Sequence, residues 1–316
     1  MSPEGNVATG TVPLVTYTKK GGNMSEYTIQ NENLQLTISS KGAEMKSLIR
    51  KRDGQELLWQ ADPAFWGRTS PVLFPVVGCY NNGISVYEGR EYKMSQHGFA
   101  RDAEFTFESQ TENEIWFSLS DSEVTHEKYP FAFLLTIGYV LQDDSVEVIW
   151  KVKNTDSKRI FFSIGGHPAF NCKLNESKLQ FTKNEKIVAE PLTCSIIEGD
   201  GSGCLSNRQK QLNLTAGILS MSDELFAEDA LIIEDRQADA VTLIDEAGAS
   251  VLKVSFDSPL FGIWSPVGKH APFVCIEPWY GRCDRRDFTG DLTEREYGNR
   301  LEVGEEFCAK YKVEVI

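Results

Sequence analysis

The feature that most constrains this chain is an alternation of apolar and polar residues with a period of two. Leu34, Leu36 and Ile38 alternate with polar residues, and the run from Ser145 to Lys153 repeats the pattern. Successive side chains of a β-strand point to opposite faces, so this period is typical of strands with one buried face. The chain is therefore expected to form half-buried strands over most of its length.

Turn signals separate these strands at short intervals. Asp53-Gly54 and Glu88-Gly89 stand at the centres of predicted hairpins. The best helix candidate is the segment SDELFAEDA, in which Ser222 is expected to cap a short helix. Because helical periodicity is otherwise nearly absent, the chain is predicted to be all-β, an antiparallel sandwich or barrel with few short helices.

The length of 316 residues permits one or two domains, since all-β domains often run beyond about 200 residues. Residues 1–23 are rich in Gly, Thr, Ser and Pro and lack sustained periodicity, so they are predicted to be a flexible N-terminal extension or leader. No linker interrupts residues 24–316, which are predicted to form a single domain.

Composition narrows the class of partner. A formal net charge of −14 opposes binding to nucleic acid and to anionic membranes, so a small molecule is the expected partner. The seven cysteines are scattered singly without CxxC pairs, which indicates reduced thiols in a cytoplasmic protein. No apolar run reaches the roughly 18 residues of a membrane-spanning helix.

Ionisable residues stand among Gly, Pro and aromatic residues in the segments FWGRTSPVLFPVVG, SQHGFARD, IGGHPAFN and CIEPWYGRCD. His167 follows two glycines and precedes a proline, so its imidazole is the main side-chain feature there; the alternative is a buried structural histidine. Glu277 ends an apolar run, and a buried carboxylate is costly unless it is paired or functional; the alternative is a partner for Arg68 or Arg282.

The turn of the second segment offers further donors. His97 and Arg101 flank Gly98, and Arg68 precedes an apolar segment; the alternatives are a structural histidine and an arginine that stacks on Trp66. An imidazole and a carboxylate supply a general acid and a general base, and aromatic rings suit the apolar face of a sugar. No motif for a cofactor, a phosphate loop or a metal is present, so a metal site would depend wholly on the fold.

The ordered set of Arg68, HGFARD, GGHPAFN and IEPWYG resembles the aldose 1-epimerase (galactose mutarotase) family, and most closely its branch of LacX-type and hexose-6-phosphate-mutarotase-like proteins. The resemblance covers the chain from about residue 24 to its end and implies a large twisted antiparallel β-sandwich. It implies an isomerase without a cofactor, which interconverts the α and β anomers of an aldohexose or hexose phosphate.

The resemblance also implies roles for individual residues. His167 matches the general acid and Glu277 the general base. Arg68 and His97 match positions that hold sugar hydroxyls, and Trp279 is expected to contact the substrate. Asp229 matches the sugar-binding aspartate, although Glu234 and Asp235 compete for this match because the segment aligns loosely. A monomer or homodimer is expected.

A cluster of basic residues raises the question of phosphate. Arg282, Arg285, Arg286 and Lys269 could neutralise a sugar phosphate, or they could form a solvated turn with the interleaved aspartates. Two other functions stay open. One is a non-catalytic carbohydrate-binding sandwich, in which Trp264, Trp279 and Arg68 hold a sugar and no proton moves; the other is a glycoside hydrolase or polysaccharide lyase. Hydrolases more often pair two carboxylates, whereas this chain offers one carboxylate and one histidine.

Overall fold

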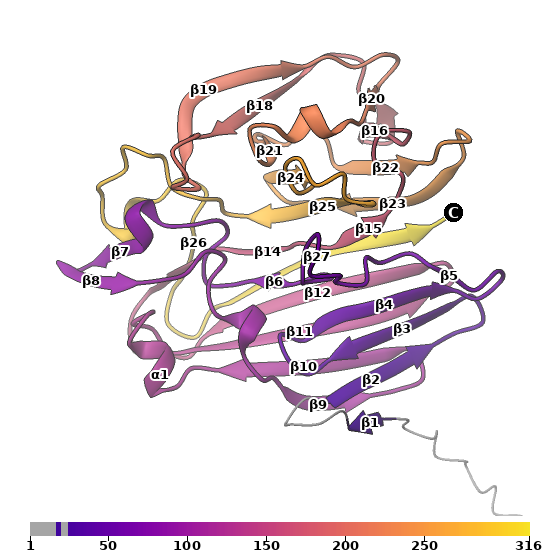
Figure 1. Ribbon diagram of the computed structural model, residues 1–316. Helices are drawn as coiled ribbons and strands as arrows, with labels where there is room; N and C mark the ends of the chain where they lie inside the picture. Colours follow the sequence, from indigo (N-terminus) through magenta and orange to yellow (C-terminus); the bar gives the residue numbers. More distant parts are fainter. Residues whose placement is uncertain (1–16, 20–24) are drawn as a thin grey trace, which may run out of the picture.

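Long antiparallel strands dominate the computed structural model, which describes residues 17–19 and 25–316 (Figure 1). The longest neighbours are β11 (Phe133–Gln142), β12 (Ser145–Asn154) and β27 (Glu306–Val315). Along β12 the predicted alternation is confirmed, because Val146, Val148, Trp150 and Val152 are all buried. The all-β prediction is therefore correct.

The largest sheet has ten strands, in the order β17-β16-β22-β23-β27-β12-β11-β10-β9, with β20 beside β16. Besides β11, β12 and β27, its strands are β9 (Thr106–Gln110), β10 (Glu114–Ser120), β16 (Lys178–Lys183), β17 (Lys186–Ile187), β20 (Ile218–Ser220), β22 (Ala240–Ile244) and β23 (Ser250–Phe256).

The second sheet has eight strands, in the order β19-β18-β21-β24-β25-β14-β6, with β15 beside β25. Its strands are β6 (Val72–Leu73), β14 (Ile164–Gly166), β15 (Ala169–Asn171), β18 (Leu192–Ile197), β19 (Leu205–Leu212), β21 (Leu231–Ile233), β24 (Leu260–Trp264) and β25 (Phe273–Tyr280).

A third sheet of five strands lies near the N-terminus. Its strands are β1 (Tyr17–Lys19), β2 (Ser25–Gln30), β3 (Leu34–Ser39), β4 (Glu44–Arg50) and β5 (Gln55–Glu56). The two small sheets are β7 (Ile84–Tyr87) with β8 (Arg90–Lys93), and β13 (Ile160–Phe162) with β26 (Asn299–Leu301). The helical segments are short: α1 (Glu123–His126) and the 3₁₀ turns η1 (Asn81–Gly83), η2 (Ala100–Asp102), η3 (Asp223–Phe226) and η4 (Leu292–Glu294).

Aromatic side chains join the sheets into layers. Trp150 of β12 meets Tyr280 of β25 edge-on at 6.4 Å, and Phe256 of β23 packs on Phe261 of β24 at 5.0 Å. These contacts set the ten-stranded sheet against the eight-stranded sheet. Such face-to-face packing of two sheets makes a β-sandwich.

The predicted turns form, and the predicted helix differs. Asp53-Gly54 joins β4 to β5, and Glu88-Gly89 joins β7 to β8 with positive φ at both residues. The expected helix after Ser222 is only the single 3₁₀ turn η3, and the Ser222 side chain makes no capping hydrogen bond. No helix among the described residues is long and apolar enough to cross a membrane.

One part of the predicted N-terminal extension is structured. Residues Tyr17–Lys19 form β1, which pairs with β2, because an exposed edge strand offers backbone partners to any extended segment. The expectation of a segment without regular structure is therefore wrong at these three residues. The rest of residues 1–23 lies outside the described residues.

Candidate active site

Strand β25 divides its side chains between two environments. Val274 and Ile276 enter the main hydrophobic cluster between the sheets, whereas Cys275, Glu277 and Trp279 point to the opposite face. A pocket of about 260 Å³ opens on that face, and Glu277 and Trp279 line it. Because the strand is buried on both faces, its sequence does not alternate.

Glu277 is a buried and almost unpartnered carboxylate. Its residue is 1% exposed, and neither carboxylate oxygen has a hydrogen-bond partner among the described residues. The nearest ionisable atom is His167 Nε2, which lies 3.4 Å from Glu277 Oε2. Burial raises the pKa of Glu277 well above its usual range, and the charge of Asp229 adds to the effect.

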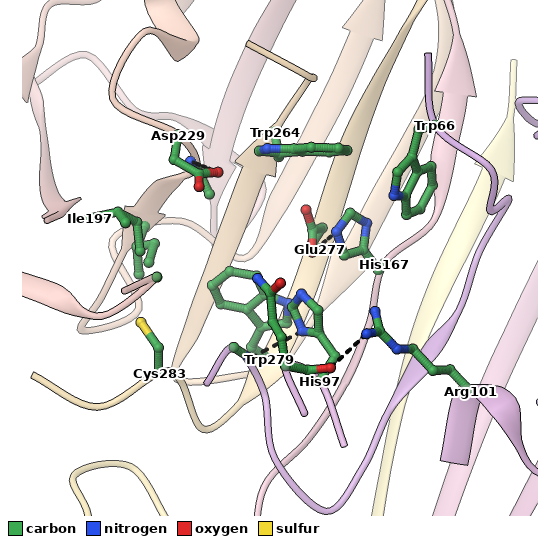
Figure 2. Close-up of a pocket in the computed structure, with 15 residues that line it drawn as sticks. Trp66, His97, Arg101, His167, Ile197, Asp229, Trp264, Glu277, Trp279 and Cys283 are labelled. Carbon is green, nitrogen blue, oxygen red and sulfur yellow. Dashed lines mark hydrogen bonds and ion pairs between the residues drawn. The ribbon is translucent and has the colours of Figure 1, made fainter. Parts of the chain in front are cut away.

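His167 lies between β14 and β15, at the side of Glu277 (Figure 2). The glycines before it are needed for packing, since a Cβ on Gly165 would lie 2.6 Å from Trp279 Cδ1. Aromatic rings enclose the imidazole: Trp66 stacks on it at 4.7 Å, and Trp264 meets it edge-on at 5.4 Å. Burial lowers the pKa of His167 to about 3, and Arg101 and Arg68 act in the same direction.

A raised pKa for Glu277 and a lowered pKa for His167 both favour the uncharged forms, a carboxylic acid beside a neutral imidazole, which together hold one proton. An ion pair of carboxylate and imidazolium contains the same number of protons. The two forms therefore differ only by transfer of one proton within the pair.

His97 is held as a hydrogen-bond donor. The Gly78 backbone N–H donates to His97 Nδ1 at 3.1 Å, so in the neutral ring the proton is on Nε2. The ring lines the pocket and meets His167 edge-on at 5.6 Å. Burial lowers the pKa of His97 well below its usual value, and repulsion from His167 and Arg101 lowers it further, so the ring stays neutral.

Of the three acidic residues that compete for the match to the sugar-binding aspartate, Asp229 lines the pocket. Glu234 instead accepts from Arg282 and from Ser195, and Asp235 accepts from Tyr297 at 2.6 Å. Both of those carboxylates are therefore already engaged outside the pocket.

Arg68 and Arg101 differ in position. Arg68 does not line the pocket and pairs with Asp102 at 2.9 Å. Arg101, on η2, does line it, and its Nη2 donates to the Gln96 carbonyl at 2.6 Å. Burial lowers the pKa of Arg101 to about 10, so its guanidinium stays charged at neutral pH. Trp66 stacks on His167 and not on Arg68. The only sequence signal for Trp66 as a residue of the site is its position directly before Gly67-Arg68.

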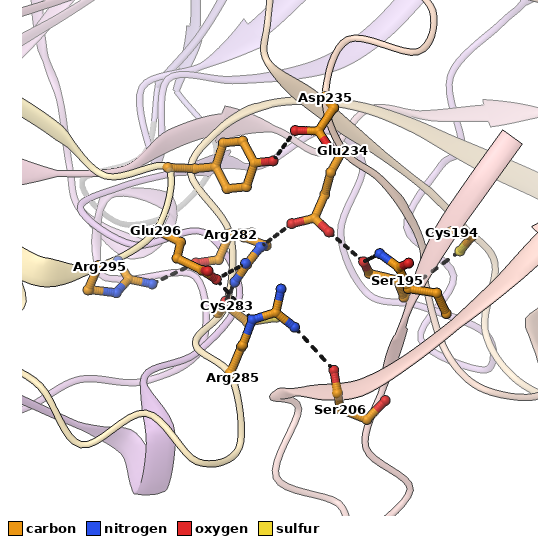
Figure 3. Close-up of polar contacts among 12 residues, drawn as sticks. Cys194, Ser195, Ser206, Glu234, Asp235, Arg282, Cys283, Arg285, Arg295 and Glu296 are labelled. Atoms are coloured by element: carbon orange, nitrogen blue, oxygen red, sulfur yellow. Dashed lines mark hydrogen bonds and ion pairs between the residues drawn. The ribbon is translucent and has the colours of Figure 1, made fainter.

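The three arginines of the basic cluster pair with acidic residues, and Figure 3 shows the pairs of Arg282 and Arg285. Arg282 is 2% exposed and pairs with Glu234 and Glu296. Arg285 also pairs with Glu296, at 3.0 Å, and the remaining members are engaged too: Arg286 pairs with Asp200 at 2.7 Å and Lys269 donates to the Phe65 carbonyl at 2.8 Å. None of the four lines the pocket, so the cluster is a structural network and not a free phosphate site.

A thiol completes the buried group around Glu277. Cys275 lies two residues earlier on β25, and its Sγ is within 4.8 Å of donor atoms of both His167 and Glu277. Imidazole, thiol and carboxylate are the ligand types that bind zinc. The fold thus creates a possible metal-ligand set that no spacing in the sequence indicates.

Comparisons with known proteins agree with this geometry. The sequence pattern of the aldose 1-epimerase family matches residues 25–303. The plasmid-encoded and chromosomal LacX proteins of Lactococcus lactis subsp. lactis are each 31% identical over 87% of this chain and 91% of their own length.

Solved structures show the same fold. A galactose mutarotase related enzyme from Lactobacillus acidophilus superposes with a TM-score of 0.85 at 34% identity, over 92% of this chain and 97% of that chain. A galactose mutarotase-like protein from Lactobacillus casei gives a TM-score of 0.85 at 29% identity, over 92% of this chain and 100% of that chain. Together with the matched residues, these similarities place the chain in the aldose 1-epimerase family.

Proposed function

We propose that this protein is a mutarotase that opens and recloses the ring of an aldohexose or hexose phosphate, with His167 and Glu277 as its catalytic pair. The observation that carries the proposal is the 3.4 Å separation of His167 Nε2 and Glu277 Oε2 on one buried pocket wall. The two sugar oxygens that exchange protons, O1 and O5, are bonded to the same carbon. An acid and a base in contact with each other can therefore reach both oxygens of one bound sugar.

The reaction needs one proton on the pair throughout. Glu277 takes the proton of the O1 hydroxyl while His167 gives a proton to O5, so the C1–O5 bond breaks and C1 becomes an aldehyde. Rotation about the bond between C1 and C2 exposes the other face of the aldehyde. Glu277 then returns its proton to O1, and His167 recovers the proton of the O5 hydroxyl as the ring closes.

The pKa shifts of the pair agree with the middle of this cycle. After ring opening, Glu277 is protonated and His167 is neutral, and these are the forms that burial favours. The pocket is therefore suited to stabilise the open-chain intermediate, and binding of the closed sugar must support the charged form of the pair.

Other lining residues are suited to hold the sugar. His97 Nε2–H can donate a hydrogen bond to one sugar hydroxyl, and the Asp229 carboxylate can accept a hydrogen bond from another. Trp264 and Trp279 supply apolar surface for a ring face. Arg101 is the cationic side chain that lines this pocket among the described residues, and we propose it as the partner of a phosphate group on the sugar.

The cellular setting follows from other features. We propose a cytoplasmic protein, because all seven cysteines are free thiols.

A single domain over residues 24–316 is supported by one hydrophobic cluster that contains residues from Ile29 to Val315.

Polarimetry of freshly dissolved α-D-glucose, α-D-galactose and glucose 6-phosphate tests the function directly. The protein is expected to accelerate the approach to anomeric equilibrium for at least one of them, and the ranking of kcat/KM identifies the preferred class. Saturable binding of these sugars without any acceleration would instead support a carbohydrate-binding protein, and the appearance of a new reducing end from a glycoside would support a hydrolase.

A further inference from the structure

We infer that His167, Cys275 and Glu277 form a binding site for Zn²⁺ and that the bound ion inhibits the enzyme. The inhibition rests on the proposed function, because the ion would occupy donor atoms of both members of the catalytic pair. The binding does not, since it depends only on which side chains the fold brings together.

Two adjacent strands create the site. Cys275 and Glu277 are two residues apart on β25, so their side chains project from the same face. His167 directly precedes the Pro168-β15 segment, and β15 pairs with β25 through Ala169 and Cys275. His167 is 7% exposed, Cys275 is 0% exposed and Glu277 is 1% exposed, so the ligand set is buried beneath the pocket.

The separations match those of a zinc site. Zn–N, Zn–O and Zn–S bonds of about 2.0 to 2.3 Å place tetrahedral ligands about 3.3 to 3.8 Å from one another. His167 Nε2 and Glu277 Oε2 are already 3.4 Å apart. One ligand atom from each of the three residues lies within 4.8 Å of the other two, so a modest shift of the thiol closes the set around an ion.

The carboxylate donors are also unoccupied. Both carboxylate oxygens of Glu277 are buried and have no hydrogen-bond partner among the described residues. Buried polar atoms without partners are uncommon, so a ligand that satisfies them gains free energy that an already bonded site would not provide. His167 and Glu277 both line the pocket, which provides the entry path for the ion.

The chemistry of binding is balanced without a redox step. Zn²⁺ displaces two protons to solvent, that of the Cys275 thiol and the one held by the His167–Glu277 pair, and binds the thiolate, the Glu277 carboxylate and the neutral His167 ring. Three protein ligands leave the fourth tetrahedral position open toward the pocket, where water or a sugar hydroxyl can bind. Such an open site is accessible to chelators, so inhibition is expected to be reversible.

Cobalt spectroscopy on the full chain tests the ligands without reference to activity. Co²⁺ is expected to bind at one ion per chain in equilibrium dialysis and to give a thiolate-to-cobalt charge-transfer band in the near ultraviolet. Cys275→Ser should abolish the band and weaken Zn²⁺ binding tenfold or more. Cys308→Ser is the matched control, because it removes an exposed thiol on β27 and should leave the band unchanged.

Activity provides the second measurement. Zn²⁺ should inhibit wild-type mutarotation and EDTA should restore it, and half-maximal inhibition of Cys275→Ser, measured relative to its own metal-free rate, should need at least tenfold more Zn²⁺. If Cys275→Ser does not fold, Glu277→Gln replaces it in the dialysis measurement and should also bind Zn²⁺ at least tenfold more weakly. Equal Zn²⁺ affinity in wild type and variants, or a band that is lost in Cys308→Ser instead, would overturn the inference. A wild-type band without any mutarotation would support the site and refute the proposed function.

Discussion

At the scale of single residues, burial has a larger effect than neighbouring charge on the ionisable groups of the pocket. Burial is the largest cause of the pKa shifts of Glu277, His167 and His97. Burial favours the uncharged form of each group, which keeps His97 a neutral donor and favours a carboxylic acid at Glu277 beside a neutral imidazole at His167. The same shifts make the stability of the protein depend on pH.

We predict that His167 destabilises the native protein in acid. Native His167 stays neutral down to about pH 3, whereas an unfolded histidine takes up a proton near pH 6.5. Between these values the unfolded chain binds more protons, so the free energy of unfolding falls as the pH drops through this window. Relative to His167→Gln, wild type should lose stability from about pH 6.5 downward in denaturant titrations.

The control for this measurement is His126→Gln, which removes a half-exposed histidine on α1. A difference between wild type and His167→Gln that stays constant between about pH 4 and pH 8 would contradict the lowered pKa of His167.

At the scale of strands and turns, the sequence predicted the strands and hairpins that depend on local residue patterns. The alternation along β12 and the Glu88-Gly89 hairpin are both visible in the sequence and both form. Two features depend on tertiary contacts that the sequence does not show. β1 forms by pairing with β2, and Arg101, which the sequence offered only as one possible donor, lines the pocket whereas Arg68 does not.

Gly165 of β14 provides a test at this scale. Its missing side chain makes room for Trp279, since a Cβ would approach Trp279 Cδ1 to 2.6 Å and the Pro278 carbonyl oxygen to 3.1 Å. Gly165→Ala is expected to lower the free energy of unfolding by about 1–3 kcal/mol, because overpacking forces neighbours to shift. It should also reduce sugar affinity, because Trp279 lines the pocket.

Gly199→Ala is the matched control, since nothing lies within 4 Å of the added Cβ. Thermal and denaturant unfolding of both variants decide the question. Equal stability of Gly165→Ala and Gly199→Ala would show that the close approach of β14 to Trp279 is not required.

At the scale of the whole molecule, the net charge of −14 opposes any anionic substrate, so recognition of a phosphate needs a local cation. The sequence suggested Arg282, Arg285 and Arg286 for this role, but each of them pairs with an acidic residue, namely Glu234 and Glu296 for Arg282, Glu296 for Arg285 and Asp200 for Arg286. Sequence proximity to Glu277 could not reveal those partners. The resemblance to a family nevertheless identified His167, His97, Asp229 and Glu277, which the fold gathers around one pocket.

We predict that Arg101→Met discriminates between sugars. Loss of a charge-assisted hydrogen bond of about 1.5–3 kcal/mol should raise KM for glucose 6-phosphate about 10-fold to 100-fold, with a much smaller change for glucose. Arg286→Met removes a partly exposed arginine outside the pocket and should change neither value. Equal effects of Arg101→Met on both sugars would remove Arg101 from phosphate recognition.

The central claim, proton transfer by the catalytic pair, is tested most directly by the anomer exchange rate of Glu277→Gln in exchange NMR. The amide keeps the shape of the side chain but cannot accept the O1 proton, so the account predicts a loss of about 10²-fold to 10⁴-fold in kcat, with folding and sugar binding retained. Glu246→Gln, which alters an exposed glutamate paired with Lys173, should exchange anomers at the wild-type rate. Near-normal exchange by Glu277→Gln would contradict the proposed mechanism.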